Sequence, residues 1–198
     1  MKLSNGLSLS IGNIGRTVNF SLPPIRGCCP NCVVCSKTCY AMEAYRLYKN
    51  VKAVWDKNLD MVNEDPECLE EIYKYIVSGC KPIEFFRIHT SGDFINREYL
   101  LKWCDIAKRT PNVKYLAFTK NYDLINENAD MIPENMNVVF SGWTGLEMNN
   151  PHNFPVAWLN DGIETRIPET ATECSGSCET CKDCWSIKKG ENKYFNKH

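Results

Sequence analysis

Two groups of four cysteines, one near each end of the 198-residue chain, constrain its fold more than any other feature. The first group has the C-x2-C-x2-C-x3-C spacing with which bacterial ferredoxins hold [4Fe–4S] clusters, although Tyr40 stands where that run has proline. The second group repeats these spacings in reverse order. We therefore predict metal or cluster ligands in segments 28–39 and 174–184. The eight predicted ligands are Cys29, Cys32, Cys35, Cys39, Cys174, Cys178, Cys181 and Cys184.

Iron–sulfur clusters and zinc are the two candidate occupants of these groups. Each group places four cysteines within 11 residues, whereas zinc sites commonly pair two CxxC units across a longer loop. This compact spacing favours two [4Fe–4S] clusters, with zinc as the alternative. For the second group, a structural metal without a redox role is a further alternative, because a chain end with few apolar residues gains stability from a bound metal.

The ligand set of the first group is left open by Cys28. Cys28, Cys32 and Cys35 together spell CxxxCxxC, the spacing by which radical S-adenosylmethionine enzymes bind three irons of a cluster and leave the fourth for their substrate. With that set one iron is free, which makes S-adenosylmethionine chemistry possible. With Cys29 and Cys39 as ligands the site is closed, and electron transfer or a structural role remains. The ferredoxin-like spacing favours the closed set.

Composition and charge narrow the class of protein. The chain is 43% hydrophobic and 24% charged, as is ordinary for globular proteins, and its length suits a single α/β domain spanning 1–198. A net charge of −1 gives no general attraction to nucleic acid or to a membrane, and we expect neither as a partner. The basic stretch 188–198, with four lysines and one glutamate, is expected to be solvated.

The expected compartment is the cytoplasm. The sequence has no apolar run near the ~18 residues of a membrane span, and its first residues lack the apolar core of a signal peptide. In a reducing compartment, clustered cysteines bind metals more often than they form disulfides. The cysteines without partner spacing, Cys68, Cys80 and Cys104, are interpreted as small buried residues.

Hydrophobic patterns predict alternating strands and helices after the first cysteine group. The clearest helix begins at Pro66 behind an Asp65 cap and ends before Gly79. Alternation predicts parallel strands joined by right-handed crossovers, hence an α/β fold: a partial (βα) barrel or an open parallel sheet, with cysteine-rich cluster-binding segments at both ends. The strands are expected at 17–22, 83–89, 113–119, 137–141 and 155–159, and the helices at 40–50, 51–63, 66–78, 96–109 and from 121.

Polar residues stand where these strands end, and ligands bind at the carboxyl ends of parallel strands. Arg87 and His89 are expected on the same strand face, where a cation and a titratable ring can bind an anionic substrate or relay protons. The alternative is a buried ion-paired group with Asp93 or Glu84. The candidate catalytic residues are Arg87, His89 and Asp93, and the candidate cofactor-binding residues are Ser91, Gly92 and Lys120.

The first cysteine loop follows a strand, so we expect it to open onto this same edge. The mirrored spacing of the two cysteine groups predicts that they lie together or flank one shared cavity. The loop Thr90–Phe94 is expected to line the cavity that faces the N-terminal cysteine loop.

Several short motifs together carry a resemblance to a known family. They are LSIGN near the start, FSLPP at 20–24, the first cysteine run continuing as SKTCYA to 41, FRIHTSGDF at 86–94 and C-x2-C-x2-CW at 178–185. In this combination the chain resembles the phage-encoded "gene product 88" family, whose biochemical activity is poorly defined. The resemblance implies metal or cluster binding by six cysteines, whereas Cys32 stands at a position where more variation is expected. The six are Cys29, Cys35, Cys39, Cys178, Cys181 and Cys184.

A weaker similarity is to the small radical S-adenosylmethionine enzymes. These are partial (βα) barrels with CxxxCxxC after the first strand and a Gly-Gly-Glu-like loop after the second. Ser91-Gly92-Asp93 stands in the place of that loop. The sequence departs from the pattern at Val34, where an aromatic residue is usual, and at Asp93, where Glu is usual.

These observations predict an iron–sulfur protein with redox or radical chemistry, of phage or mobile-element type. Whether it is an enzyme stays open. S-adenosylmethionine is implied only by the open ligand set. A redox role implies an electron donor such as ferredoxin or flavodoxin and a small-molecule substrate. The alternative is a zinc-stabilised, non-catalytic phage protein that binds a macromolecular partner.

Overall fold

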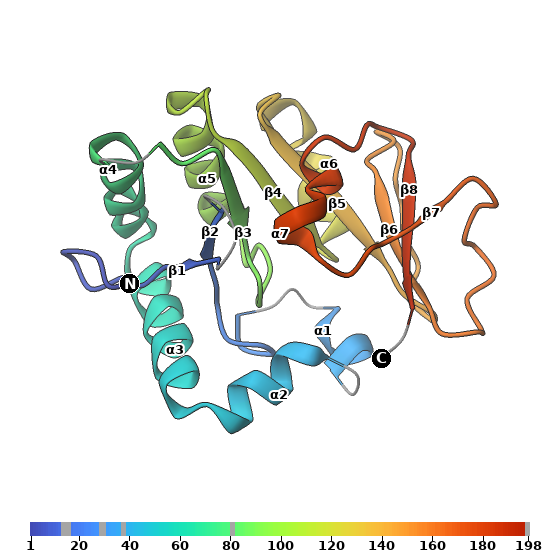
Figure 1. Ribbon diagram of the computed structural model, residues 1–198, viewed down its shortest axis with the longest axis horizontal. Helices are drawn as coiled ribbons and strands as arrows, with labels where there is room; N and C mark the ends of the chain where they lie inside the picture. Colours follow the sequence, from blue (N-terminus) through green and yellow to red (C-terminus); the bar gives the residue numbers. More distant parts are fainter. Residues whose placement is uncertain (13–16, 28–30, 37–38, 80–81, 197–198) are drawn as a thin grey trace.

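One mostly parallel β-sheet organises the chain (Figure 1). The computed structural model describes residues 1–12, 17–27, 31–36, 39–79 and 82–196. Within them the sheet has eight strands in the order β1-β2-β3-β4-β5-β6-β8-β7; β1 pairs antiparallel with β2, and the other neighbouring pairs are parallel. The strands are β1 (Ser10–Ile11), β2 (Thr17–Phe20), β3 (Phe85–Ile88), β4 (Lys114–Thr119), β5 (Met136–Gly142), β6 (Val156–Asn160), β7 (Thr172–Glu173) and β8 (Asn192–Asn196).

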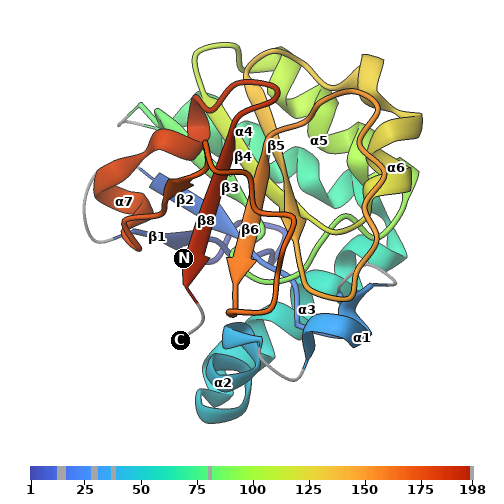
Figure 2. The ribbon, with the colours of Figure 1, turned by 90° about the vertical axis from the view of Figure 1, so that its right-hand side faces the viewer.

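Helices cover the two faces of the sheet unequally. Figures 1 and 2 show α5 and α6 on one face and the short helix α7 on the other. No helix of the described residues has both the length and the apolar character needed to cross a membrane. The α-helices are α1 (Cys32–Cys35), α2 (Tyr40–Leu47), α3 (Lys49–Glu64), α4 (Glu70–Ser78), α5 (Arg97–Arg109), α6 (Tyr122–Glu127) and α7 (Cys178–Cys181), and the 3-10 helices are η2 (Pro66–Leu69), η3 (Ala129–Met131) and η4 (Asp183–Trp185).

Strand order explains this asymmetry. Strands β2 to β6 are neighbours in chain order, without the reversal that divides helices between both faces of a doubly wound sheet. Crossovers of one hand that advance in one direction lie on one face. The other face is left for a different part of the chain to cover. The prediction of an α/β fold with an open parallel sheet is confirmed.

Alternating side chains build a separate core on each face. On the helical face, Phe86, Tyr115 and Phe140 join the large core that includes residues of α3 to α6. On the opposite face, strand residues including Phe85 and Leu116 form a smaller core with Trp185 and its neighbour two residues on. The C-terminal cysteine segment therefore covers the face that the crossovers leave bare.

The helix start predicted at Asp65 is present in the structure. The Asp65 side chain accepts a hydrogen bond from the Glu67 N–H at 2.9 Å, as expected for a cap, although the predicted helix divides into η2 and α4.

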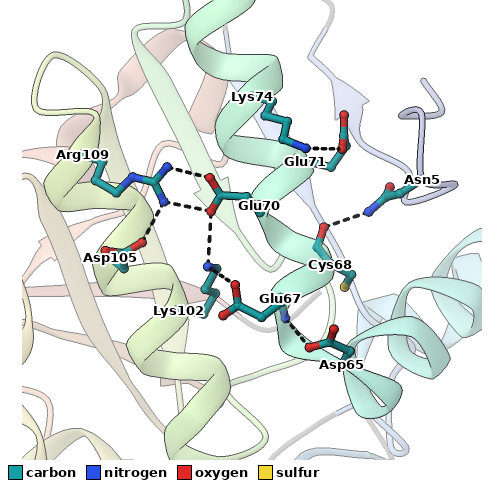
Figure 3. Close-up of polar contacts among 10 residues, drawn as sticks. All are labelled: Asn5, Asp65, Glu67, Cys68, Glu70, Glu71, Lys74, Lys102, Asp105 and Arg109. Atoms are coloured by element: carbon teal, nitrogen blue, oxygen red, sulfur yellow. Dashed lines mark hydrogen bonds and ion pairs between the residues drawn. The ribbon is translucent and has the colours of Figure 1, made fainter.

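Between α4 and α5, Glu70 forms ion pairs with Arg109 at 2.6 Å and Lys102 at 3.2 Å (Figure 3). The hydrogen bond from Arg109 is the main reason why the pKa of Glu70 falls to about 2.

The basic C-terminal stretch differs from its prediction. Residues Asn192–Asn196 form β8, which pairs in parallel register with β6 and lies between β6 and β7. The expectation of a solvated tail is wrong for these residues. The strand follows from the alternation of Lys193 and Phe195 on one face with Tyr194 on the other. Lys193 is buried along its stem, and its Nζ reaches Asp183 at 3.0 Å.

Candidate functional site at the carboxyl edge of the sheet

The loop that follows β3 clamps the segment that leads to the first cysteines. The Leu22 N–H donates to the Ser91 carbonyl, and the Asp93 N–H donates to the Gly27 carbonyl, each at 2.9 Å. Gly92 has φ +96°, and a Cβ there would lie 2.6 Å from the Leu22 Cβ. Both the backbone angle and the close approach require glycine at position 92. Ser91 and Gly92 thus position the chain that enters the cysteine segment.

Asp93 joins the ends of two neighbouring strands. Its buried carboxylate accepts hydrogen bonds from the Thr119 hydroxyl at 2.6 Å, the Lys120 N–H at 2.8 Å and the Phe94 N–H at 2.7 Å. Burial raises the pKa of Asp93, and the hydrogen bonds from Lys120 and Thr119 oppose that shift. This geometry gives Asp93 a positioning role between β3 and β4, and its catalytic role stays a prediction.

His89 lies in the helix-side core and not beside Arg87. Strand β3 ends at Ile88, and His89 has φ +67°, so the alternation of side chains stops there. The His89 Nε2 is 2.7 Å from the Tyr99 hydroxyl, and its ring packs on those of Tyr99 and Phe94. Burial lowers the pKa of His89 to about 3, which keeps it neutral near pH 7. The expectation that Arg87 and His89 share a face is wrong.

The alternative of a buried ion-paired group is not present either. Among the described residues, neither Arg87 nor His89 forms an ion pair with Asp93 or Glu84. Arg87 instead lies on the opposite sheet face, where its Nη1 donates to the Cys178 Sγ at 3.8 Å. Its Cζ is 5.3 Å from the centroid of the Phe118 ring.

The first cysteine segment docks on the carboxyl ends of β3 and β4. The Asn31 side-chain amide donates to the Lys120 carbonyl at 2.7 Å. The Tyr40 hydroxyl donates to the Thr90 carbonyl. These two bonds join residues on either side of the described cysteines to the strand-end loops. The predicted location of the segment at this edge is confirmed for the described residues.

The thiols of this segment interact with one another and with a cation. Burial raises the pKa of Cys35, Cys32 and Cys39 raise it further, and the Lys120 ammonium opposes the shift. The Lys120 Nζ also lies 4.7 Å from the centroid of the Trp143 ring. Cys28 and Cys29 lie outside the described residues, so the choice between open and closed ligand sets stays where the sequence leaves it.

The second cysteine segment lies across the sheet face. The Asn137 side-chain amide on β5 donates to the Cys184 carbonyl at 2.8 Å and to the Ile187 carbonyl at 2.9 Å. Burial raises the pKa of Cys184 to about 12, with further contributions from Cys178 and Cys174 and an opposing one from Lys193. Cys181 contributes in the same direction.

Each cysteine group interacts within itself. The pKa of Cys35 responds to described thiols of the first group alone, and that of Cys184 to thiols of the second. A cavity beside Arg87 is lined by Cys178 and by no described cysteine of the first group. Neither this cavity nor the hollow between η2 and α5 is lined by described cysteines of both groups. Thr90 lines the Arg87 cavity, which lies beside the second cysteine group, so the predicted role of the Thr90–Phe94 loop in a cavity facing the first group stays a prediction.

The donor chemistry of both groups fits a soft metal or an iron–sulfur cluster. The nine described cysteines are free thiols, and thiolates are the ligands that such groups prefer. In the described residues, however, no three Cys, His, Asp or Glu side chains converge on a point that holds a metal ion. The described thiols therefore supply the ligand type in two compact groups.

Two residues that line the Arg87 cavity are not among those predicted from the sequence. Thr17 and Trp185 line it together with Arg87, yet they lie far apart along the chain. The sequence signal for Thr17 is its position in a strand that pairs with β3, where it stands opposite Phe85. No local signal marks Trp185, because its place depends on where the C-terminal segment folds back.

The fold and the site define a class of protein: a mostly parallel α/β protein with a cysteine segment on the carboxyl edge of its sheet and a second one across its bare face. A model of the family described as "Gene product 88" matches residues 2–149, most of the chain, so the chain belongs to the phage gene product 88 family. The matched region contains the first cysteine group and ends before the second.

Two curated relatives are mycobacteriophage proteins. The chain is 27% identical over 132 residues to the "Gene 88 protein" of Mycobacterium phage L5 and 26% identical over 132 residues to that of Mycobacterium phage D29. Each similarity covers 60% of this chain and 55% of the relative, so the chain spans about half the length of these proteins. No solved structure matches the chain.

Proposed function

We propose that this protein is an iron–sulfur protein with redox or radical chemistry. Its first cluster would be held either by Cys29, Cys32, Cys35 and Cys39 or by Cys28, Cys32 and Cys35. The observation that carries this proposal is the docking of the first cysteine segment on the carboxyl ends of β3 and β4. In parallel α/β sheets this edge is where reactive groups and ligands are placed.

Charge at this edge supports the same proposal. A buried thiol whose pKa is raised stays protonated, and iron supplies the positive charge that converts such thiols to thiolates. A cluster bound here supplies one-electron transfer. Lys120 offsets the negative charge of the thiolates and, with the Asn31 hydrogen bond at its carbonyl, fixes the position of the segment. Such nearby charges and hydrogen bonds set the potential of a cluster.

The second cysteine group is the place where the zinc alternative has its own support. Its segment packs Trp185 and Ile187 on the sheet, yet α7 is only four residues long and β7 only two. Elements so short need a further source of stability, which a structural metal provides. In this alternative the protein is non-catalytic and acts by binding a macromolecular partner.

Metal analysis of protein purified without oxygen tests the proposal. We expect a brown protein that contains iron and acid-labile sulfide. Cys35→Ser should remove much of both, whereas Cys104→Ser, which alters a buried thiol in α5 outside both groups, should leave them unchanged. Zinc without sulfide would reject the iron–sulfur proposal and support the alternative. A cytoplasmic location and an electron donor such as ferredoxin or flavodoxin belong to this proposal.

Radical chemistry is tested by S-adenosylmethionine cleavage. The proposal includes it only if Cys28, Cys32 and Cys35 hold the cluster with one iron open. Formation of 5′-deoxyadenosine by the reduced protein, lost in Cys28→Ala and kept in Cys29→Ala, would support the open set. No cleavage, together with iron lost in Cys29→Ala, would restrict the protein to electron transfer or a structural role.

A further inference from the structure

Arg87 reaches the second cysteine group from the middle of the sheet. Strand β3 pairs in parallel with β2 and β4, and Arg87 stands opposite Asn19 on one side and Leu116 on the other. Its side chain leaves the strand on the face that the second cysteine segment covers, and its Nη1 donates to the Cys178 Sγ at 3.8 Å. A position fixed by two neighbouring strands therefore holds a cation against one thiol of this group.

The surroundings of Arg87 favour this orientation of its guanidinium. The Arg87 Cζ lies 5.3 Å from the centroid of the Phe118 ring, and Phe118 and Cys178 both pack against the small core of this face. A half-buried arginine keeps its apolar stem inside and its charged head at a polar partner. Here the charged head meets the sulfur of Cys178.

This contact gains strength when the group holds a metal. A neutral thiol is a weak hydrogen-bond acceptor, so the bond contributes little in the metal-free protein. A cysteine that coordinates zinc or iron is a thiolate, and the attraction between a guanidinium and a thiolate adds to the hydrogen bond. The Arg87 contact therefore favours the metal-bound group over the metal-free one.

Charge balance within the group favours the same role. Four cysteines that bind one zinc ion or one [4Fe–4S] cluster as thiolates form a centre with net negative charge. The thiols of Cys174, Cys178 and Cys181 all act on Cys184, so this charge would gather in a small volume. A cation beside such a centre offsets part of its charge.

Lys193 on β8 also acts on this group, but its charge is already shared. Its Nζ donates to the Asp183 carboxylate at 3.0 Å and to the Thr172 hydroxyl at 3.3 Å. Part of the Lys193 charge is therefore balanced before a metal binds. Arg87, by contrast, contacts a predicted ligand sulfur directly.

We infer that Arg87 is a positioning residue of a metal centre in the second cysteine group, which it stabilises by holding the Cys178 thiolate and offsetting its charge. The inference rests on the proposal that this group binds a metal, and it applies to zinc and to an iron–sulfur cluster alike. It assigns Arg87 a role different from the catalytic one predicted from its position near a strand end.

Metal release from the purified protein tests this role. Protein prepared without oxygen is mixed with an excess of chelator, and the released zinc and iron are followed over time. Cys178→Ser identifies the part of the release that belongs to the second group. Arg87→Met should speed that part about tenfold or more, because partners of metal ligands commonly change metal affinity by this much. Arg97→Met removes the same charge from the exposed start of α5, on the other face of the sheet, and should leave release unchanged.

Two further measurements separate this role from simple packing. Methionine keeps a long apolar side chain beside Phe118, whereas Arg87→Lys keeps the charge and an N–H donor. Release from Arg87→Lys should therefore be slower than release from Arg87→Met. Before chelator is added, hydrogen exchange over 174–187 in Arg87→Met should match that of the native protein.

Three results would each overturn the inference and leave the metal proposal standing. They are release from Arg87→Met as slow as from the native protein, release from Arg87→Lys as fast as from Arg87→Met, and exchange over 174–187 that accelerates together with release. The last result would make Arg87 a packing residue. If Cys178→Ser leaves metal content and release unchanged, the second group holds no metal. This inference then fails together with a metal in that group, and the iron–sulfur proposal for the first group stands.

Discussion

The two cysteine segments have the same spacings in mirror order, yet the structure supports them differently. The first is docked by side-chain bonds from Asn31 and Tyr40 to the loops at the carboxyl edge. The second lies across the sheet face, where Trp185 packs in a core and Asn137 anchors its backbone. The first lies inside the family match and the second outside it. The spacing therefore indicates only the type of ligand that each segment offers. The surrounding elements differ: the first segment lies at the carboxyl ends of strands, where parallel sheets bind ligands, and the second segment covers a face of the sheet.

The largest expected effect on stability is that of removing Trp185, which should loosen the second cysteine segment and leave the first unchanged. Trp185 is buried, its ring lies 5.6 Å from that of Phe85, and it is the main apolar residue of the second segment. Trp185→Ala should lower the free energy of unfolding by about 3–5 kcal/mol, as expected for a buried tryptophan. Hydrogen exchange should accelerate over 174–187 and leave the first segment protected. Equal acceleration in both segments would show that edge and cover form one cooperative unit.

Acid pH should lower the free energy of unfolding of the protein through His89, the residue that directly follows β3. Its pKa is lowered to about 3 in the folded protein and is near 6.5 when unfolded. The unfolded state therefore binds more protons between these values, so the contribution of His89 to stability is complete above pH 6.5 and falls as the pH drops toward 3. The expected loss is about 1.4 kcal/mol per pH unit, or about 2.7 kcal/mol over two units.

His89→Asn tests this assignment by denaturant unfolding at several pH values. Asparagine tolerates a left-handed backbone and does not protonate in this range. The variant should be less stable at pH 7, because the bond to Tyr99 is changed, and its stability should depend less on acid. An acid dependence identical to that of the native protein would assign the effect to other groups.

Two glycines with similar backbone angles sharpen the comparison further. Gly92 at the edge has φ +96° and no space for a Cβ, whereas Gly176 in the second segment has φ +78° and open space around it. Gly176→Ala should cost only the backbone strain, about 1–2 kcal/mol. Gly92→Ala adds the contact with Leu22, so it should cost about 1–3 kcal/mol more. If the first segment holds the proposed cluster, this variant should also contain less iron. If denaturant unfolding gave equal losses of stability for the two variants, the close packing of Gly92 against Leu22 would not stabilise this segment as proposed.

Much of the fold was predictable because its signals are local. The Asp65 cap and the alternating strand patterns are read within a few residues, and those elements are present in the structure. Strand β8 was missed because the lysines around it suggested solvation, while its pairing with β6 depends on residues 30 or more positions away. The alternation of side chains also predicted the wrong sheet face for His89. This residue follows β3 directly and has a left-handed backbone, which ends the alternation.

The candidate site was predictable only as a set of residue types. Strand ends correctly indicated that Thr90 and Lys120 lie beside the first cysteine segment. The sequence did not indicate that Thr17, Arg87 and Trp185 share a cavity. That cavity depends on the register of β2 against β3 and on the return of the C-terminal segment across the sheet, and neither is encoded by local spacing.

The smallest effect compares two asparagines that each anchor one cysteine segment. Asn31 donates one bond, to the Lys120 carbonyl, and Asn137 donates two, to Cys184 and Ile187. Asn31→Ala should cost about 0.5–1.5 kcal/mol, the usual net value of one hydrogen bond, and Asn137→Ala about 1–3 kcal/mol, because two carbonyls lose their donor.

Their effects on function should run in the opposite order. If the first segment holds the reactive cluster, Asn31→Ala should shift its reduction potential or speed iron loss, and the more destabilising Asn137→Ala should leave both nearly unchanged. Anaerobic redox titration and iron release to a chelator measure the two properties. A larger shift in Asn137→Ala would transfer the reactive role to the second segment, and with it reverse the assignment of site and cover.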